Sequence, residues 1–251
     1  MDFLDFKELL PSHGLFRSNA PELLEHYASA HTFQQQLGRW VRAQKIHQLR
    51  RGLYSVNNPA QQPQPFFIAQ YLHPGSIISM QSALDYWGLM KSPPQEIISI
   101  TTDHHERLEN HFGVFHFFQT KFHSSTKSIP IELAPGQIVA IAAPEHALLE
   151  LFYHTPDIRH AIKTKSLNIQ RPIDLPKFSS AVMELLETIS DETLHRALLL
   201  QLGIWRMEEK NGEQVIPDDL ETMLEQQMQI LEQRVSTDAH ASSRKLRSKY
   251  P

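Results

Sequence analysis

The spacing of apolar residues changes near Lys45, and this change constrains the fold more than any other feature of the sequence. Four apolar residues upstream of it recur at the spacing of one buried helix face: Phe33, Leu37, Trp40 and Val41. Downstream, residues 46–49 and 53–56 alternate between apolar and polar types, as half-buried strands do. The sequence therefore predicts a helix followed by two short strands.

The two predicted strands are separated by the Arg-Arg-Gly turn of residues 50–52. We expect Gly52 to adopt the positive φ that a tight hairpin requires. Two further helices are predicted upstream, over residues 5–10 and 18–28. Three helices followed by a basic hairpin are the layout of a winged helix-turn-helix, which we predict over residues 1–58.

The third predicted helix has an unusual polar side, because no acidic residue occurs from His31 to Leu53. Thr32 is expected to cap this helix, with Gln35 as its capping-box partner. Glutamine and arginine pair with adenine and guanine edges in the major groove, and the tip of a wing contacts phosphates. The residues predicted to bind double-stranded DNA are Thr32, Gln34, Gln35, Arg39, Arg42, Arg50 and Arg51.

The rest of the chain follows a linker rich in proline and glutamine at residues 57–65. Short strands and helices alternate as far as about residue 155, and after Arg171 the pattern is helical, with the last helix expected at residues 217–235. We therefore predict an α+β protein: a winged helix-turn-helix, a mixed α/β domain over residues 59–235 that ends in helices, and a flexible basic tail over residues 236–251.

Composition excludes several classes of protein. The 251 residues include no cysteine, so disulfides and thiolate metal sites are excluded, and we expect a cytoplasmic protein. The acidic N-terminus is unlike a signal peptide, and no stretch reaches the roughly 20 apolar residues of a membrane helix. The formal net charge is −4, so contact with DNA requires a local basic patch.

Three segments, in this order and spacing, resemble the AbiEi-type antitoxins of bacterial type IV toxin–antitoxin systems. They are "KIHQLRRGLYSV", "GSIISMQSALDYWGLM" and "APEHALLELFYH". The residues that match the family pattern are Arg50 to Tyr54, Ser79, Ser82 to Leu84, Gly88, Leu89, Pro144, Glu145 and Ala147 to Leu149. The likeness covers residues 15–155 approximately. Two departures from it are His146, in place of a basic residue, and Glu150, in place of aspartate.

The resemblance implies a protein with two roles. The N-terminal domain would bind inverted repeats at the promoter of its own operon and repress transcription. The larger domain would neutralise a nucleotidyltransferase-type toxin. The alternatives are a winged-helix regulator that senses another ligand, and a protein-interaction module that does not bind DNA.

The sequence has no recognised catalytic motif, so we expect no catalytic residue, cofactor or metal site. The best metal candidates lie in one histidine-rich stretch, which we interpret as an exposed loop: Asp103, His104, His105, Glu106 and His111. Glu145 and Glu150 are five residues apart on a predicted helix and do not share a face. Several aromatic residues could stack bases but are more typical of a core: Tyr86, Trp87, Phe115, Phe117 and Phe118. The basic tail, which includes Arg244 and Arg247, is interpreted as a solvated terminus, with contact to phosphates as the alternative.

Overall fold

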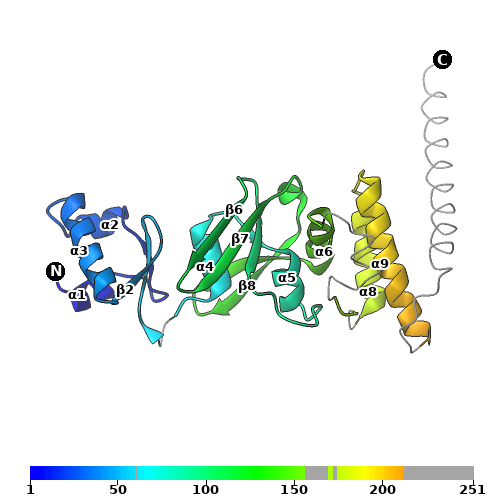
Figure 1. Cartoon of the computed structure of the whole chain (residues 1–251), viewed down its shortest axis with the longest axis horizontal. Coiled ribbons are helices and arrows are strands. Elements are labelled where there is room, and N and C mark those ends of the chain that lie inside the picture. The colour runs from blue at the N-terminus through cyan, green and yellow to red at the C-terminus, as the bar shows by residue number, and fades with distance from the viewer. Residues whose placement is uncertain (60–61, 156–168, 172–173, 212–251) are drawn as a thin grey trace, which may run out of the picture. The chain divides into compact units, whose positions relative to one another are not determined.

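The computed structural model describes residues 1–59, 62–155, 169–171 and 174–211 (Figure 1). The protein is an α+β protein, as predicted, and its chain divides into two compact units. The first unit is Met1–Pro156 with Lys165–Pro172, and the second is Asp157–Thr164 with Ile173–Pro251. The helix predicted at residues 217–235 and the basic tail lie outside the described residues. Within the described part of the chain, no helix combines the length and the apolar character needed to cross a membrane.

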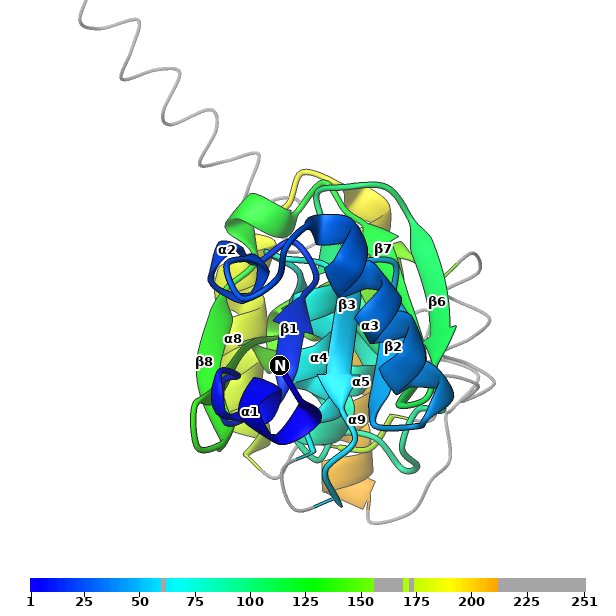
Figure 2. The same cartoon turned by 90° about the vertical axis from the view of Figure 1, so that its left-hand side faces the viewer.

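The first unit begins with three helices and a three-stranded antiparallel sheet. In chain order these elements are α1 (Phe3–Glu8), β1 (Leu15–Arg17), α2 (Pro21–Leu24), α3 (Ala30–Arg42), β2 (Ile46–Arg50) and β3 (Leu53–Val56). The strand order is β1-β3-β2, and Figure 2 shows β3 between its two partners. Strand β1 was not predicted, because three residues are too short to display the alternation of a strand.

Helix α3 is the longest of these three helices, and its burial follows the predicted stripe. Phe33, Leu37 and Trp40 are buried against the sheet. The helix begins earlier than predicted: Ser29 is the N-cap, and its Oγ accepts a hydrogen bond of 3.2 Å from the backbone nitrogen of Thr32. The prediction that Thr32 caps the helix was therefore wrong, because serine is an equally good cap and stands three residues earlier.

The β2–β3 hairpin turns through Arg51 and Gly52 as predicted, but Arg50, which was also predicted in the turn, is the last residue of β2 and pairs with Leu53. Gly52 has a φ of +82°, which favours glycine over residues that carry a Cβ. The ladder is irregular just before the turn, where Gln48 pairs with Tyr54 and Arg50 pairs with Leu53. This bulge matters for the site, because bulges change the direction in which a side chain points.

A six-stranded mixed sheet with covering helices completes the described part of the first unit. Its elements are α4 (Pro65–Leu72), β4 (Ile77–Ile78), α5 (Met80–Tyr86), β5 (Ile97–Thr101), β6 (Glu106–Asn110), β7 (Gly113–Gln119), the 3-10 turn η2 (His123–Ser125), β8 (Ser128–Ala134), β9 (Gln137–Ala142) and α6 (Pro144–Tyr153). The strand order is β6-β7-β5-β4-β9-β8. The pairs β5–β7 and β4–β9 are parallel, and the other neighbours are antiparallel.

Helices cover both faces of this sheet. The β5–β7 register places Ile98 beside His116 on one face, and Ser99 beside Phe117 on the other. The ring of Phe118, which is two residues after His116 and on the same face, lies 4.9 Å from that of His154 at the end of α6, and α5 packs against α6, so both helices lie on the His116 face. His73 ends α4 and its ring lies 5.0 Å from that of Phe117, so α4 lies on the opposite face.

The histidine-rich stretch contains a strand where an exposed loop was expected. Residues Glu106–Asn110 form β6, which pairs antiparallel with β7 at the edge of the sheet. The sequence hides this strand because four of its five residues are polar or charged. Edge strands commonly carry charge, since it discourages pairing with a further chain.

The second unit is described by two helices, α8 (Leu175–Leu186) and α9 (Glu192–Asn211), close to the predicted positions. Asp174 caps α8 by accepting a hydrogen bond from the backbone nitrogen of Lys177 at 3.1 Å. The rings of Phe178 and Trp205 meet edge to face at 5.6 Å and join the two helices.

Candidate nucleic-acid interface

The predicted DNA-binding residues of α3 form one exposed stripe. Thr32, Gln35, Arg39 and Arg42 follow one another at intervals of three, four and three residues, so they lie on one side of the helix. All four are exposed, whereas the opposite side is buried in the core. Gln34 is also exposed but lies beside this stripe. We call these four residues the α3 stripe.

Two contacts along α3 limit the freedom of long side chains in and beside the α3 stripe. The Nε2 atom of Gln35 lies 2.9 Å from Nε2 of His31, one turn earlier. Arg39 Nη1 donates to Oε1 of Gln36 at 3.4 Å, which is a long hydrogen bond. His31 was not among the predicted residues, although it stands four positions before Gln35 and so shares its side of the helix.

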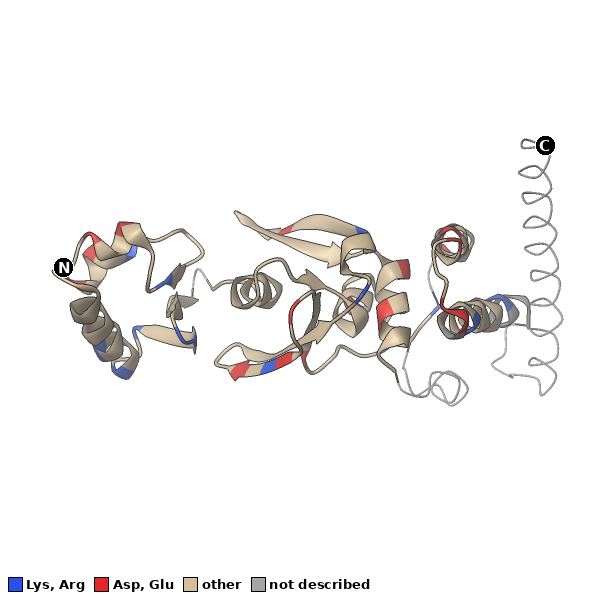
Figure 3. Cartoon of the chain, turned by 90° about the horizontal axis from the view of Figure 1, so that it is seen from above, with Lys and Arg blue, Asp and Glu red and all other residues tan. Residues whose placement is uncertain are grey.

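The α3 stripe lies within a long segment of sequence whose Lys and Arg residues are not accompanied by any acid. No Asp or Glu occurs from His26 to Leu84, which extends the acid-free run beyond the helix and hairpin. The segment contains five basic residues: Arg39, Arg42, Lys45, Arg50 and Arg51. The acids of the N-terminal elements lie in and beside α1 and α2 (Figure 3): Asp2, Asp5, Glu8, Glu22 and Glu25. A local basic surface therefore exists on a protein of net negative charge.

The two arginines at the hairpin have different surroundings. Arg51 lies in the turn and is exposed. Arg50 points toward α4, where its Nη1 donates to the backbone oxygen of Leu72 at 2.9 Å and lies 3.5 Å from Oε2 of Glu106. In this structure Arg51 is therefore free of the contacts that engage Arg50.

Gly38 lies within α3, between Gln34 and Arg42 on the outer surface of the helix. A Cβ atom built at this position meets nothing within 4 Å, and its φ is not in the left-handed region. Neither packing nor backbone geometry therefore requires glycine there. Glycine inside a helix costs about 1 kcal/mol relative to alanine, so its presence is consistent with close approach by an external molecule.

The five metal candidates of the histidine-rich stretch are divided among several different contacts. His105 lies against His116, Glu106 faces Arg50, and the ring of His111 stacks on that of His47 at 3.8 Å. Asp103 lies 3.8 Å from Nε2 of His73, and the ring of His104 is 6.3 Å from that of His73. Among the residues that the structure describes, no three His, Asp or Glu side chains are grouped so as to hold a metal ion.

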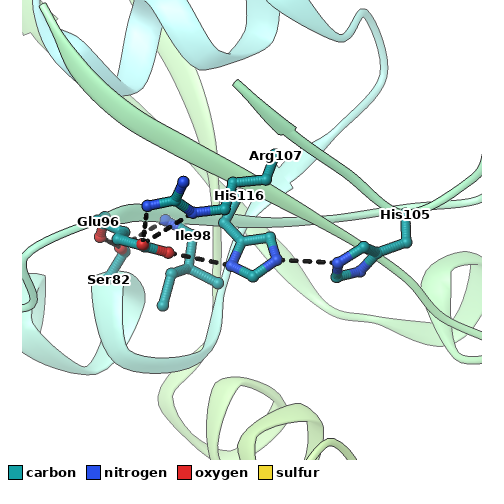
Figure 4. Close-up of polar contacts among 6 residues, drawn as sticks. All are labelled: Ser82, Glu96, Ile98, His105, Arg107 and His116. Atoms are coloured by element: carbon teal, nitrogen blue, oxygen red, sulfur yellow. Dashed lines mark hydrogen bonds and ion pairs between the residues drawn. The ribbon is translucent and has the colours of Figure 1, made fainter. Parts of the chain in front are cut away.

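A polar network on the His116 face joins α5 to the β6–β7 hairpin (Figure 4). Arg107 donates to Oε1 of Glu96 through Nε at 3.0 Å and Nη2 at 2.7 Å. The other oxygen of Glu96 lies 3.0 Å from Nδ1 of His116, whose Nε2 is 3.0 Å from Nε2 of His105. The hydrogen bonds from Arg107 lower the pKa of Glu96. Burial lowers the pKa of His116, although the bond to Glu96 opposes this effect.

This network fixes the orientation of the His116 ring, because both of its nitrogens have a partner. Glu96 is itself held by Ser82, whose Oγ accepts from the backbone nitrogen of Ile98 at 2.8 Å and donates to the backbone oxygen of Glu96 at 3.3 Å. A carboxylate that accepts from Nδ1 leaves Nε2 of the imidazole to face His105. His116 was predicted to be a hydrogen-bonded sheet residue, but its partners could not be predicted, because Glu96 and His105 lie in the loops that precede β5 and β6.

Glu150 of α6 is a fully buried acid. Thr120 Oγ1 donates to its Oε1 at 2.9 Å, and its Oε2 lies 3.7 Å from Nε2 of His154. Burial raises the pKa of Glu150 to about 7, an effect that the bond from Thr120 partly opposes. Glu145, at the first turn of the same helix, is also buried, so neither acid forms an exposed catalytic pair.

The aromatic residues weighed as a base-stacking surface are divided between core and surface. Phe115 and Phe117 are fully buried, and Trp87 Nε1 donates to the backbone oxygen of Ala142 at 2.8 Å. Tyr86 is exposed and Phe118 is half-buried.

A comparison with protein-family models found no matching family, and a comparison with curated proteins found no matching sequence.

Proposed function

We propose that the N-terminal elements form a winged helix that binds double-stranded DNA. In this proposal α3 enters the major groove and the β2–β3 turn contacts the phosphate backbone. The observation that carries it is the exposed α3 stripe, which lies within a long segment without acidic residues. The side chains of that stripe can pair with base edges, and the nearby arginines can neutralise phosphates.

The resemblance to AbiEi-type antitoxins extends this proposal. The DNA that we propose is the promoter of the protein's own operon, bound at inverted repeats in the bacterial cytoplasm. The remainder of the chain then acts by binding, without chemistry of its own, to neutralise a nucleotidyltransferase-type toxin. Co-expression with the product of the neighbouring gene tests this second role, since an antitoxin restores the growth that the toxin arrests.

A direct binding experiment tests the DNA-binding role. The full chain is titrated into a labelled duplex from its own upstream region and into a shuffled duplex of equal length, at several salt concentrations. We expect tighter binding to the upstream duplex, with an affinity that falls as salt rises, because bound phosphates release counterions.

One observation favours a protein-interaction module as the second candidate function. Arg50 and Arg17 both donate to backbone oxygens at the end of α4, so two basic groups near the hairpin are engaged in contacts within the protein. A protein that uses its hairpin only as a scaffold binds neither duplex, and the same titration separates the two functions.

A further inference from the structure

Two arginines of the N-terminal sheet bind the C-terminal end of α4. Arg17 Nη2 donates to the backbone oxygen of Tyr71 at 2.8 Å, and Arg50 Nη1 donates to that of Leu72 at 2.9 Å. The last carbonyl groups of a helix have no partner within the helix and carry partial negative charge. Arginine is therefore a favourable partner there, and these two bonds join the N-terminal elements to the six-stranded sheet domain.

Glu106 of β6 adds a full negative charge beside Arg50. Its Oε2 lies 3.5 Å from Arg50 Nη1, and this oxygen is buried without a hydrogen bond among the described residues. The Arg50 side chain is 37% exposed and that of Glu106 is 20% exposed. A buried carboxylate oxygen needs a compensating charge, so Arg50 balances Glu106 in this arrangement.

The bulge in β2 explains why adjacent arginines differ. The register slips between Gln48 and Arg50, which directs Arg50 toward α4 and leaves Arg51 in the exposed turn. Arg50 is nevertheless one residue from the turn, within reach of the same phosphate backbone. The contacts with Leu72 and Glu106 both involve Nη1, so a phosphate that binds the remaining donors of Arg50 still competes with the charge of Glu106.

We propose that Glu106 competes with DNA phosphate for Arg50 and thereby lowers the affinity of the protein for DNA. The six-stranded sheet domain then restrains the DNA-binding surface through one carboxylate. A partner that moved β6 away from β2 would release Arg50 and tighten DNA binding. This restraint rests on the proposed function, because it matters only if the N-terminal elements bind DNA.

The test measures affinity for the upstream duplex across a salt series. In Glu106→Gln we expect the affinity for DNA to rise about two- to fivefold, because this ratio corresponds to the free energy that a partly exposed ion pair contributes. The slope of log affinity against log salt steepens by about 0.9, because Arg50 gains a phosphate. Glu109→Gln is the matched control, since Glu109 is an exposed acid of the same strand whose side chain alternates to the other face. This control leaves the salt slope unchanged.

Variants of Arg50 complete the test. In an Arg50→Ala background, Glu106→Gln produces no gain in affinity, because the side chain that it releases is absent. Arg50→Ala alone keeps the wild-type salt slope, whereas Arg51→Ala flattens that slope by about 0.9. The comparison of Arg50→Ala with Arg51→Ala does not require Glu106→Gln to fold. Melting curves establish that each variant is folded.

Three results would overturn the competition. The first is an equal change of DNA affinity in Glu106→Gln and Glu109→Gln. The second is a gain in affinity from Glu106→Gln that persists in the Arg50→Ala background. The third is a flattened salt slope in Arg50→Ala, which would mean that Arg50 already contacts phosphate. A wild-type protein that shows no salt-dependent binding to either duplex contradicts the proposed function itself, so the two failures are distinguishable.

Discussion

Gly38 is the residue of α3 whose presence the protein's own packing does not explain. Gly38→Ala should stabilise the protein by about 0.5–1 kcal/mol, because alanine favours a helix and its Cβ meets no neighbour. If DNA approaches α3 closely at this point, the same methyl group weakens binding to the upstream duplex. Melting curves and duplex titrations measure the two effects on one variant. A more stable variant with unchanged affinity would place the DNA elsewhere.

Glu150 makes stability depend on pH in a direction that can be stated in advance. Its ordinary pKa is 4.5, and burial raises it to about 7 in the folded protein. Between these values the folded chain retains a proton that the unfolded chain has released. The stabilisation is therefore complete below about pH 4.5 and is lost as pH rises through 7.

Glu150→Gln removes this dependence, because glutamine resembles the protonated acid and stays neutral. From pH 5 to pH 8 the wild type should lose on the order of 2–3 kcal/mol relative to the variant. His154 faces Glu150, and burial lowers its pKa, so it destabilises the fold in acid. The comparison of wild type with variant by denaturant unfolding at each pH cancels most of that effect. Parallel stability curves would show that Glu150 does not hold the proton.

At the scale of elements, the β2–β3 hairpin allows charge and backbone geometry to be tested separately. Arg51→Ala should flatten the salt slope of DNA binding by about 0.9 and change stability by less than about 0.5 kcal/mol, because the residue is exposed. Gly52→Val should destabilise the fold by about 1–3 kcal/mol, since a β-branched residue is strained at a φ of +82°. Melting curves and salt titrations of both variants check this. A destabilised Arg51→Ala or a stable Gly52→Val would contradict the hairpin geometry.

The sequence predicts those elements whose stability comes from regular apolar spacing. The stripe of Phe33, Leu37 and Trp40 is buried as predicted, because a 3.6-residue period specifies one helix face. Strands β1 and β6 were missed for different reasons. The first is too short to show a period, and the second lies at a sheet edge, where half-exposed positions accept charge.

The candidate site could be predicted only in part. Helical spacing places Gln35, Arg39 and Arg42 together without knowledge of the fold. The direction of Arg50 could not be predicted, because it depends on a bulge and on Leu72 and Glu106, which are distant in sequence. Local patterns identify which side chains an element exposes, whereas tertiary contacts decide which of them remain free.

At the scale of the molecule, the central claim is that α3 reads a DNA sequence while the sheet domain restrains the hairpin. Arg39 is the most direct probe of this claim, because it lies in the α3 stripe and contacts only Gln36 among the hydrogen bonds described. Arg206→Ala is a matched control, since it removes the same charge from an exposed position of α9 in the second unit.

The decisive measurement is the affinity of wild type, Arg39→Ala and Arg206→Ala for the upstream and shuffled duplexes at one salt concentration. If Arg39 pairs with a base, Arg39→Ala weakens binding to the upstream duplex by about 1–3 kcal/mol more than binding to the shuffled one. Arg206→Ala leaves both affinities unchanged. Equal losses on the two duplexes, or a wild type that does not distinguish them, would contradict sequence reading by α3.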